Sequence, residues 1–221
     1  MNILAVDTSS KAASVAVYRD ELLLGECLYN HGKNHSIYIA PMIEEMLEAS
    51  AITIKDIDYF ACGVGPGSFT GVRIGVTMMK TFAMINNKPC VSIDSLYALA
   101  QYEAPKSKVV IAIEDARRDR VFACGVSDRE TIIDTGVFPL EELYSRLSAY
   151  NHKDILFVGG GTRIYENSLH NQGYIIDQNS LISGRAIGTA AMEEISKGNV
   201  IDCDNLLPKY LLKSQAEQSK K

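Results

Sequence analysis

Residues 2–18 read NILAVDTSSKAASVAVY, and residues 108–126 read KVVIAIEDARRDRVFACGV. Each stretch has an apolar run that ends in an acid, then a short polar turn and a second apolar run. Such runs, rich in Val and Ile on either side of a turn, predict two strands joined in a hairpin. An offset of 108 residues places Asp115 on Asp7. The chain is therefore expected to contain one structural unit twice.

The segments around the hairpins complete this repeat. In the first half, we expect strands at 2–6, 13–18, 22–29, 59–64 and 90–93, and helices at 36–49, 70–85 and 95–102. In the second half, we expect strands at 108–115, 121–126, 131–137 and 154–161, and helices at 139–150, 162–169 and 184–199. The order βββαβα in each half is the layout of the actin-like fold of Hsp70 and the sugar kinases. The predicted fold class is α/β with two lobes, an N-terminal, partner-binding lobe at 1–104 and a C-terminal lobe at 105–221.

The composition limits the classes of protein that the chain can represent. Apolar residues make up 47% of it, which is enough for real cores, and the formal net charge is −5, which excludes a general attraction to nucleic acid. Its five cysteines are widely spaced and form no CxxC pair, a pattern typical of cytosolic proteins. The first residues become polar too soon for a signal peptide, and no apolar run reaches the roughly 20 residues of a membrane helix. We expect a cytoplasmic chain without a membrane segment.

The two hairpins depart from the pattern that binds nucleotides. In the actin-like fold ATP lies between the lobes, and backbone N–H groups of the hairpins hold its phosphates at close range, which favours glycine. The first turn is Asp7-Thr8-Ser9-Ser10, with Ser9 where glycine is usual, and the second begins at Asp115 and has no glycine. Both hairpins look degenerate, so we expect no bound cofactor. The glycines at 159–161 resemble the turn that touches adenosine, but a tight strand-to-helix turn alone also requires them.

A second glycine-rich stretch, GVGPGSFTG at 63–71, lies between a predicted strand and a predicted helix. Two nucleotide-binding motifs start with such a glycine, the Walker motif GxxxxGK[ST] and the dinucleotide fingerprint GxGxxG. Counted from Gly65, both require their last glycine at position 70, which is Thr70 here, so neither motif is present. We expect a structural loop that turns sharply and sets the helix close to its sheet, with Thr70 as the helix cap. The loop consists of Gly65, Pro66, Gly67, Ser68, Phe69, Thr70 and Gly71.

The helices predicted at 36–49 and 70–85 have unusually wide apolar faces. The face of the second spans about 200°, whereas a helix that packs on one sheet needs a stripe of about 100°. Methionine is frequent on both faces, as in adaptable binding surfaces. We expect a partner interface here, although an unusually buried core helix would explain the same pattern. The candidate interface residues are Val72, Val76, Met78, Met79, Phe82, Ile39, Met42 and Met46.

Five motifs together resemble the TsaB (YeaZ) family. They are ILAVDTSS at 3–10, HSIYIAPMIEEML at 35–47, GVGPGSFTGVRIG at 63–75, DARR at 115–118 and LPKYLL at 207–212. The resemblance implies a non-catalytic relative of TsaD, the enzyme that transfers a threonylcarbamoyl group to the tRNA adenosine beside the anticodon. It implies binding to TsaD together with TsaE. We expect the wide apolar helices to face TsaD, or a second copy of the chain in a homodimer when TsaD is absent, and we expect contact with tRNA only through the complex.

Two enzymatic alternatives are a small-molecule kinase of the same fold and a glycoprotease-like metalloenzyme. The degenerate hairpins argue against the kinase. TsaD-like enzymes carry an HxxxH metal motif, and the corresponding positions here are Ser95 and Leu99, of which leucine cannot bind a metal. A different HxxxH, formed by His31 and His35, spans a glycine and has no third ligand nearby, so we expect no metal and no catalytic residue.

A basic cluster follows the second hairpin acid. It consists of Arg117, Arg118 and Arg120 and is interrupted by Asp119. The mixed charge favours a solvated turn, whereas a phosphate contact, to RNA or to a nucleotide held by a partner, is the alternative.

Overall fold

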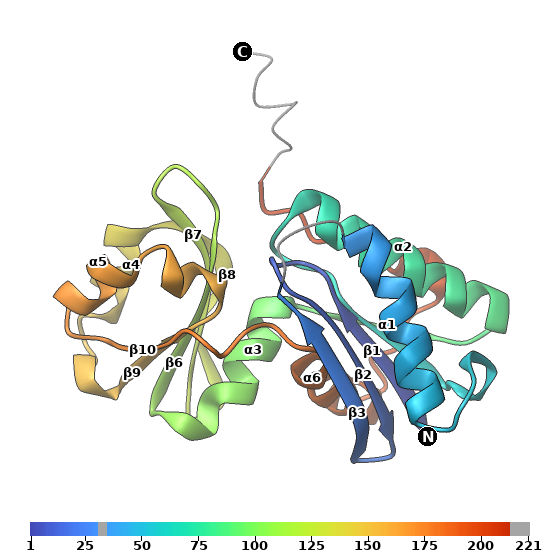
Figure 1. Ribbon diagram of the computed structural model, residues 1–221. Coiled ribbons are helices and arrows are strands. Elements are labelled where there is room, and N and C mark those ends of the chain that lie inside the picture. Colours follow the sequence, from blue (N-terminus) through green and yellow to red (C-terminus); the bar gives the residue numbers. More distant parts are fainter. Residues whose placement is uncertain (31–34, 213–221) are drawn as a thin grey trace.

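The computed structural model describes residues 1–30 and 35–212, which form two lobes, each built on a mixed five-stranded sheet (Figure 1). The first sheet contains β1 (Asn2–Asp7), β2 (Ala13–Arg19), β3 (Leu22–Tyr29), β4 (Tyr59–Gly63) and β5 (Cys90–Ile93). The second contains β6 (Val109–Asp115), β7 (Arg120–Ser127), β8 (Glu130–Pro139), β9 (Ile155–Val158) and β10 (Ile175–Asp177). The sequence does not predict β10, because three residues are too few to show a period.

The two sheets have the same strand order. In the first, the order is β3-β2-β1-β4-β5, and β1 pairs antiparallel with β2 and parallel with β4. In the second, the order is β8-β7-β6-β9-β10, and β6 pairs antiparallel with β7 and parallel with β9. The predicted duplication of a βββαβα unit in a two-lobed α/β fold is therefore confirmed.

The helices lie close to their predicted positions, with one clear exception. They are α1 (His35–Ala49), α2 (Phe69–Asn86), α3 (Ser95–Glu103), α4 (Leu140–Leu147), α5 (Glu166–Asn171) and α6 (Gly184–Ser196). The prediction of a helix at 162–169 is wrong, because a 3-10 turn, η4 (Gly160–Arg163), follows β9 and α5 begins only at Glu166. Gly159 enters this turn with a φ of 95°, in the left-handed region that glycine tolerates.

The helices form two layers on the first sheet. α1 and α2 pack on its outer face, in a core that also contains Leu4 and Phe60 (Figure 1). α3 and α6 lie between the two sheets, in a core that contains Ile3 from the first sheet and Val110 from the second. One continuous apolar layer therefore joins the lobes.

The predicted division of the chain at 104/105 separates the two sheets but not the two middle helices. α3 precedes the division and packs on β6 and β7, whereas α6 follows it and packs on β1 and β2. The start of α6 is held by Ser14, whose Oγ accepts a hydrogen bond from the Gly184 N–H at 2.7 Å. The apolar spacing of a helix shows that it is buried but not which sheet it covers.

The chain after α6 returns to the first lobe. Ile201 forms a β-bridge with Cys90, Leu206 is fully buried in the outer core, and the Lys209 N–H donates to the Val64 carbonyl at 2.8 Å. Leu211 then packs against the core between the sheets. This C-terminal strap ties the glycine-rich loop to the layer that joins the lobes.

All five cysteines are free thiols, as their spacing predicts. Cys62, Cys90 and Cys124 are buried, and burial raises the pKa of Cys124 to about 12. Such thiols stay protonated and act as small apolar side chains. Within residues 1–30 and 35–212, no helix is long and apolar enough to cross a membrane.

Candidate functional site

The acid of the first hairpin, Asp7, is buried and bonded by its own chain. Its side chain is 1% exposed. Its Oδ1 accepts hydrogen bonds from the N–H and the hydroxyl of Ser9, both at 2.8 Å, and its Oδ2 accepts one from the Ser95 hydroxyl at 2.6 Å. Burial raises the pKa of Asp7, against the effect of these hydrogen bonds. Asp7 therefore organises the turn and does not face an open binding site.

The glycine-rich loop packs directly on this hairpin. The Ser68 N–H donates to the Ser9 carbonyl at 2.6 Å, and the Thr8 hydroxyl donates to the Gly71 carbonyl at 2.7 Å. A Cβ on Gly67 would lie 2.1 Å from the Ser9 carbonyl oxygen, and a Cβ on Gly71 would lie 2.1 Å from that of Thr8. The loop therefore holds the start of α2 in close contact with the hairpin.

The prediction that Thr70 caps α2 is wrong. α2 begins at Phe69, and its N-cap is Ser68, whose Oγ accepts the Gly71 N–H at 3.2 Å. Thr70 is exposed in the first turn. Both hydroxyl residues suit a cap, but only Ser68 lies before the first helical residue.

The structure also corrects which acid of the second half corresponds to Asp7. Asp7 shares its face of β1 with Ala5, and Glu114 shares its face of β6 with Ala112; both alanines lie in the core between the sheets. Because side chains alternate along a strand, Asp115 points to the other face. There its Oδ1 accepts hydrogen bonds from the Tyr165 hydroxyl at 3.1 Å and from the Arg117 N–H at 2.8 Å. Glu114, and not Asp115, is the counterpart of Asp7.

Each of these two acids rests on a glycine of the neighbouring strand or turn. A Cβ on Gly63 would lie 1.9 Å from the Asp7 carboxylate, and a Cβ on Gly160 would lie 2.9 Å from that of Glu114. The Glu114 side chain is 8% exposed, and its Oε1 accepts the Gly160 N–H at 2.9 Å. Its Oε2 has no hydrogen-bond partner among the described residues. The triple glycine at 159–161 therefore makes room for a buried carboxylate of the same chain and donates a hydrogen bond to it.

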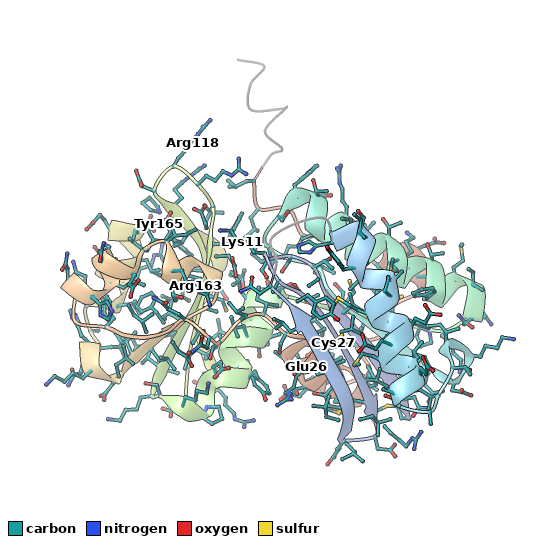
Figure 2. All side chains as sticks on the ribbon, in the orientation of Figure 1. Lys11, Glu26, Cys27, Arg118, Arg163 and Tyr165 are labelled. Carbon is teal, nitrogen blue, oxygen red and sulfur yellow. The ribbon has the colours of Figure 1, made fainter. Side chains whose placement is uncertain are left out.

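Burial raises the pKa of Glu114 to about 7. The Gly160 N–H lowers this pKa, the negative charges of Asp7 and Asp115 raise it, and the positive charge of Lys11 lowers it. Figure 2 shows Lys11 between the two lobes, on the first hairpin. The charge of Glu114 therefore changes near neutral pH.

Only one of the two histidines of the HxxxH motif lies among the described residues. His31 lies outside them, and the His35 Nε2 is 2.9 Å from the Ser10 carbonyl, to which it donates. Ser95, at a position where TsaD-like enzymes have a metal ligand, donates to Asp7, and Leu99 is fully buried. Within the part of the chain that the structure describes, no three His, Cys, Asp or Glu side chains are grouped as metal ligands.

The eight candidate interface residues lie mostly inside the first lobe. Six of them are buried in its outer core, namely Val72, Val76, Met79, Ile39, Met42 and Met46. For these six the alternative of a buried core helix holds, because α1 and α2 share one face of the sheet and each covers part of the other. Met78 and Phe82 are half-buried at the edge of the same core.

The apolar side chains that α1 and α2 do expose are different ones. Ile37 and Tyr38 of α1 are 59% and 40% exposed, and Met84 and Ile85 of α2 are 60% and 72% exposed. Their positions on the helices are visible in the sequence, but the width of an apolar arc does not show where the lobe's own core ends.

Relatives of this chain have been named in several bacteria. The family model described as "TsaD: tRNA N6-adenosine threonylcarbamoyltransferase" matches residues 30–217. The "tRNA threonylcarbamoyladenosine biosynthesis protein TsaB" of Bacillus subtilis is 30% identical over 230 aligned positions, which cover 98% of this chain and 96% of that protein. This chain belongs to the TsaB (YeaZ) family.

Solved structures agree with this family. The structure described as "YeaZ from Pseudomonas aeruginosa" has a TM-score of 0.80 and 25% identity, and the match covers 95% of this chain and 99% of that one. The activator of the 2-hydroxyisocaproyl-CoA dehydratase from Clostridium difficile, solved with bound ADPNP, has a TM-score of 0.56 and 11% identity over 90% of this chain and 97% of that one. That likeness concerns the fold alone, and it fits the two-lobed, actin-like architecture.

Two residues of this TsaB-family chain have roles that the sequence reasoning missed. Glu114 could have been found, because the alternation Val110, Ala112, Glu114 continues one face of β6. The hydrogen bond from Ser95 to Asp7 spans 88 positions and leaves no local signal in the sequence.

Proposed function

We propose that this chain is an accessory subunit, without catalysis of its own, in the threonylcarbamoyl modification of the tRNA adenosine beside the anticodon. In this role it binds a TsaD-type transferase, together with a TsaE-type protein, in the cytoplasm, and it meets tRNA only within that complex. The names of its relatives support the pathway. The observation that carries the accessory role is that both helices on the outer side of the first lobe expose large apolar side chains, Ile37 and Tyr38 near the start of α1 and Met84 and Ile85 at the end of α2.

The charges of the two helices support a homodimer through the same surface when the chain is alone. α1 has three glutamates, Glu44, Glu45 and Glu48, and no lysine or arginine. α2 has no acid and two cations, Arg73, which donates to the Tyr210 hydroxyl, and Lys80, which pairs with Asp204. In a two-fold dimer the same patch meets itself, so α1 of one copy can face α2 of the other with opposite charges. A TsaD-type partner would displace the second copy.

Glutamate at Ile37 of α1 or at Ile85 of α2 should abolish capture of the partner while the chain stays folded. Both side chains are largely exposed, so folding does not depend on them. An unpaired carboxylate in a packed interface costs several kcal/mol, and a micromolar complex has only about 8 kcal/mol of binding free energy. We expect a loss of affinity of about 100-fold or more, measured by titration calorimetry with the TsaD-type protein and by light scattering for the dimer.

The matched control is Ile175→Glu, which changes an exposed isoleucine on β10 of the second lobe. Circular dichroism should be unchanged for all three variants, and only the control should keep both associations. Wild-type affinity in both helix variants would exclude this surface as the interface.

Mg-ATP should not bind to the isolated chain with micromolar affinity, and no turnover should be detected. The reason is that both oxygens of Asp7 are bonded by Ser9 and Ser95 and that neither hairpin turn contains glycine. Titration calorimetry and a phosphate-release assay measure the two quantities. Micromolar binding with turnover that disappears in Asp7→Ala would contradict the accessory role and favour a small-molecule kinase.

A further inference from the structure

The turn between β6 and β7 has an unusual backbone. Arg117, Arg118 and Asp119 have φ angles of 63°, 56° and 55°, so three consecutive residues other than glycine lie in the left-handed region. Such residues are rare because their Cβ atoms crowd the backbone. The turn is held by the Ala116 N–H, which donates to the Arg120 carbonyl at 2.9 Å, and by the Arg117 N–H on Asp115. This backbone directs the side chains of Arg117 and Arg118 outward.

Both arginines are exposed and lack partners in the described part of the chain. Neither guanidinium forms an ion pair, a hydrogen bond or a cation–π contact there. Other arginines of the chain are paired: Arg146 lies 2.7 Å from Glu142, and Arg185 lies 3.1 Å from Glu26. The guanidinium groups of the turn are therefore available to a ligand.

The first hairpin presents a further cation near the same region. Lys11 is exposed and forms no hydrogen bond or ion pair among the described residues, although its charge acts on the buried Glu114. Figure 2 shows Lys11 between the two lobes and Arg118 at the tip of the second hairpin. Asp7 and Glu114 are buried beneath the two turns, whereas Asp119 is exposed within the second turn and forms no ion pair with the arginines among the described residues. A chain with a net charge of −5 thus exposes unpaired positive charge at its two hairpin tips.

We propose that Arg117 and Arg118, together with Lys11 of the first hairpin, bind phosphate groups of the RNA backbone. This inference rests on the proposed function, because the tRNA of that reaction supplies the phosphates. Guanidinium groups match phosphate oxygens in a bidentate geometry, and such contacts position the RNA without reading its sequence. The three cations lie on turns, whereas the proposed protein interface lies on α1 and α2.

The test uses the full-length chain, alone and saturated with its TsaD-type partner, and an unmodified tRNA transcript as the probe. Fluorescence anisotropy gives the dissociation constant at several salt concentrations between about 50 and 200 mM, the range over which phosphate contacts weaken steeply. The variant is Arg117→Glu with Arg118→Glu. The control is Arg129→Glu, since Arg129 is also exposed, also has a positive φ, and lies in the turn at the opposite end of β7.

We expect the double variant to bind tRNA at least about tenfold more weakly. The slope of the logarithm of its binding constant against the logarithm of the salt concentration should be shallower by about one to two. Arg129→Glu should stay within about threefold of the wild type. Arg117→Lys with Arg118→Lys should lose less affinity than the double glutamate variant, because the charge remains although the bidentate geometry is lost. Equal affinities of the double variant and the control, or no tRNA binding by the chain or its complex, would overturn the inference.

Competition identifies the ligand. If poly-glutamate displaces the tRNA as well as unlabelled tRNA does, the turn binds acidic protein and the inference is wrong. A double variant that captures the partner normally and binds tRNA like the wild type would overturn this inference alone. If the wild-type chain fails to capture the partner, the accessory role is wrong. The role of the turn is then still decided by comparing the tRNA affinities of the wild-type chain and the double variant, each alone.

Discussion

Gly71→Ala should lower the free energy of unfolding by about 3 kcal/mol or more, at the upper end of what overpacking costs. Helix propensity alone predicts the opposite, because alanine stabilises a helix interior by about 1 kcal/mol relative to glycine. At this position steric repulsion outweighs helix propensity, so the substitution should destabilise the fold. The new Cβ would lie 2.1 Å from the Thr8 carbonyl oxygen, and Thr8 is fully buried. Backbone, and not a flexible side-chain end, must therefore move.

The displacement would also break the hydrogen bond from the Thr8 hydroxyl to the Gly71 carbonyl. Urea unfolding followed by circular dichroism measures the effect. The control is Gly25→Ala in β3, where the nearest atom to a new Cβ is the Met46 sulfur at 3.5 Å, an ordinary contact. If Gly71→Ala proves as stable as Gly25→Ala, the close packing of the loop on the hairpin is not what requires glycine.

The duplication was predictable because both hairpins repeat the same chemistry, an apolar strand that ends in an acid before a polar turn. The sequence did not show which acid of the second hairpin corresponds to Asp7. Two acids, Glu114 and Asp115, stand side by side at the end of β6, and a shift of one residue moves a side chain to the other face. Only the cores on each face, with Ala112 on one and Ile113 on the other, assign Glu114 to the layer between the lobes.

The candidate interface residues show a second limit of prediction from the sequence. The apolar arc of α2 correctly indicates that more than one surface buries the helix. In the structure the further surfaces are α1 and the C-terminal strap of the same chain, so Val76 and Met79 are core residues and Ile85 is exposed. A periodic pattern measures how much of a helix is buried, and it carries no information on whether the covering surface belongs to the same chain.

Glu114→Gln should make the chain more stable at pH 8 and leave its stability near pH 4 little changed. The pKa of Glu114 is raised from 4.5 to about 7 in the folded chain, chiefly by burial. A carboxyl group whose folded pKa is raised binds its proton more tightly in the folded state, so its contribution to stability is lost as pH rises from about 4.5 to 7. A shift of this size corresponds to roughly 3 kcal/mol.

Glutamine preserves the favourable part of the site and removes the titration. Its side-chain oxygen can still accept the Gly160 N–H, and no charge then needs to be buried beside Asp7. The measurement is the free energy of unfolding in urea at pH values from 4 to 8, compared with Glu130→Gln, which changes an exposed glutamate at the start of β8. The wild type and the control should both lose stability across this range, and the difference between wild type and Glu114→Gln should grow with pH towards roughly 3 kcal/mol. Parallel curves for all three proteins would mean that Glu114 does not hold a proton at neutral pH, and that Lys11 or water neutralises its charge in solution.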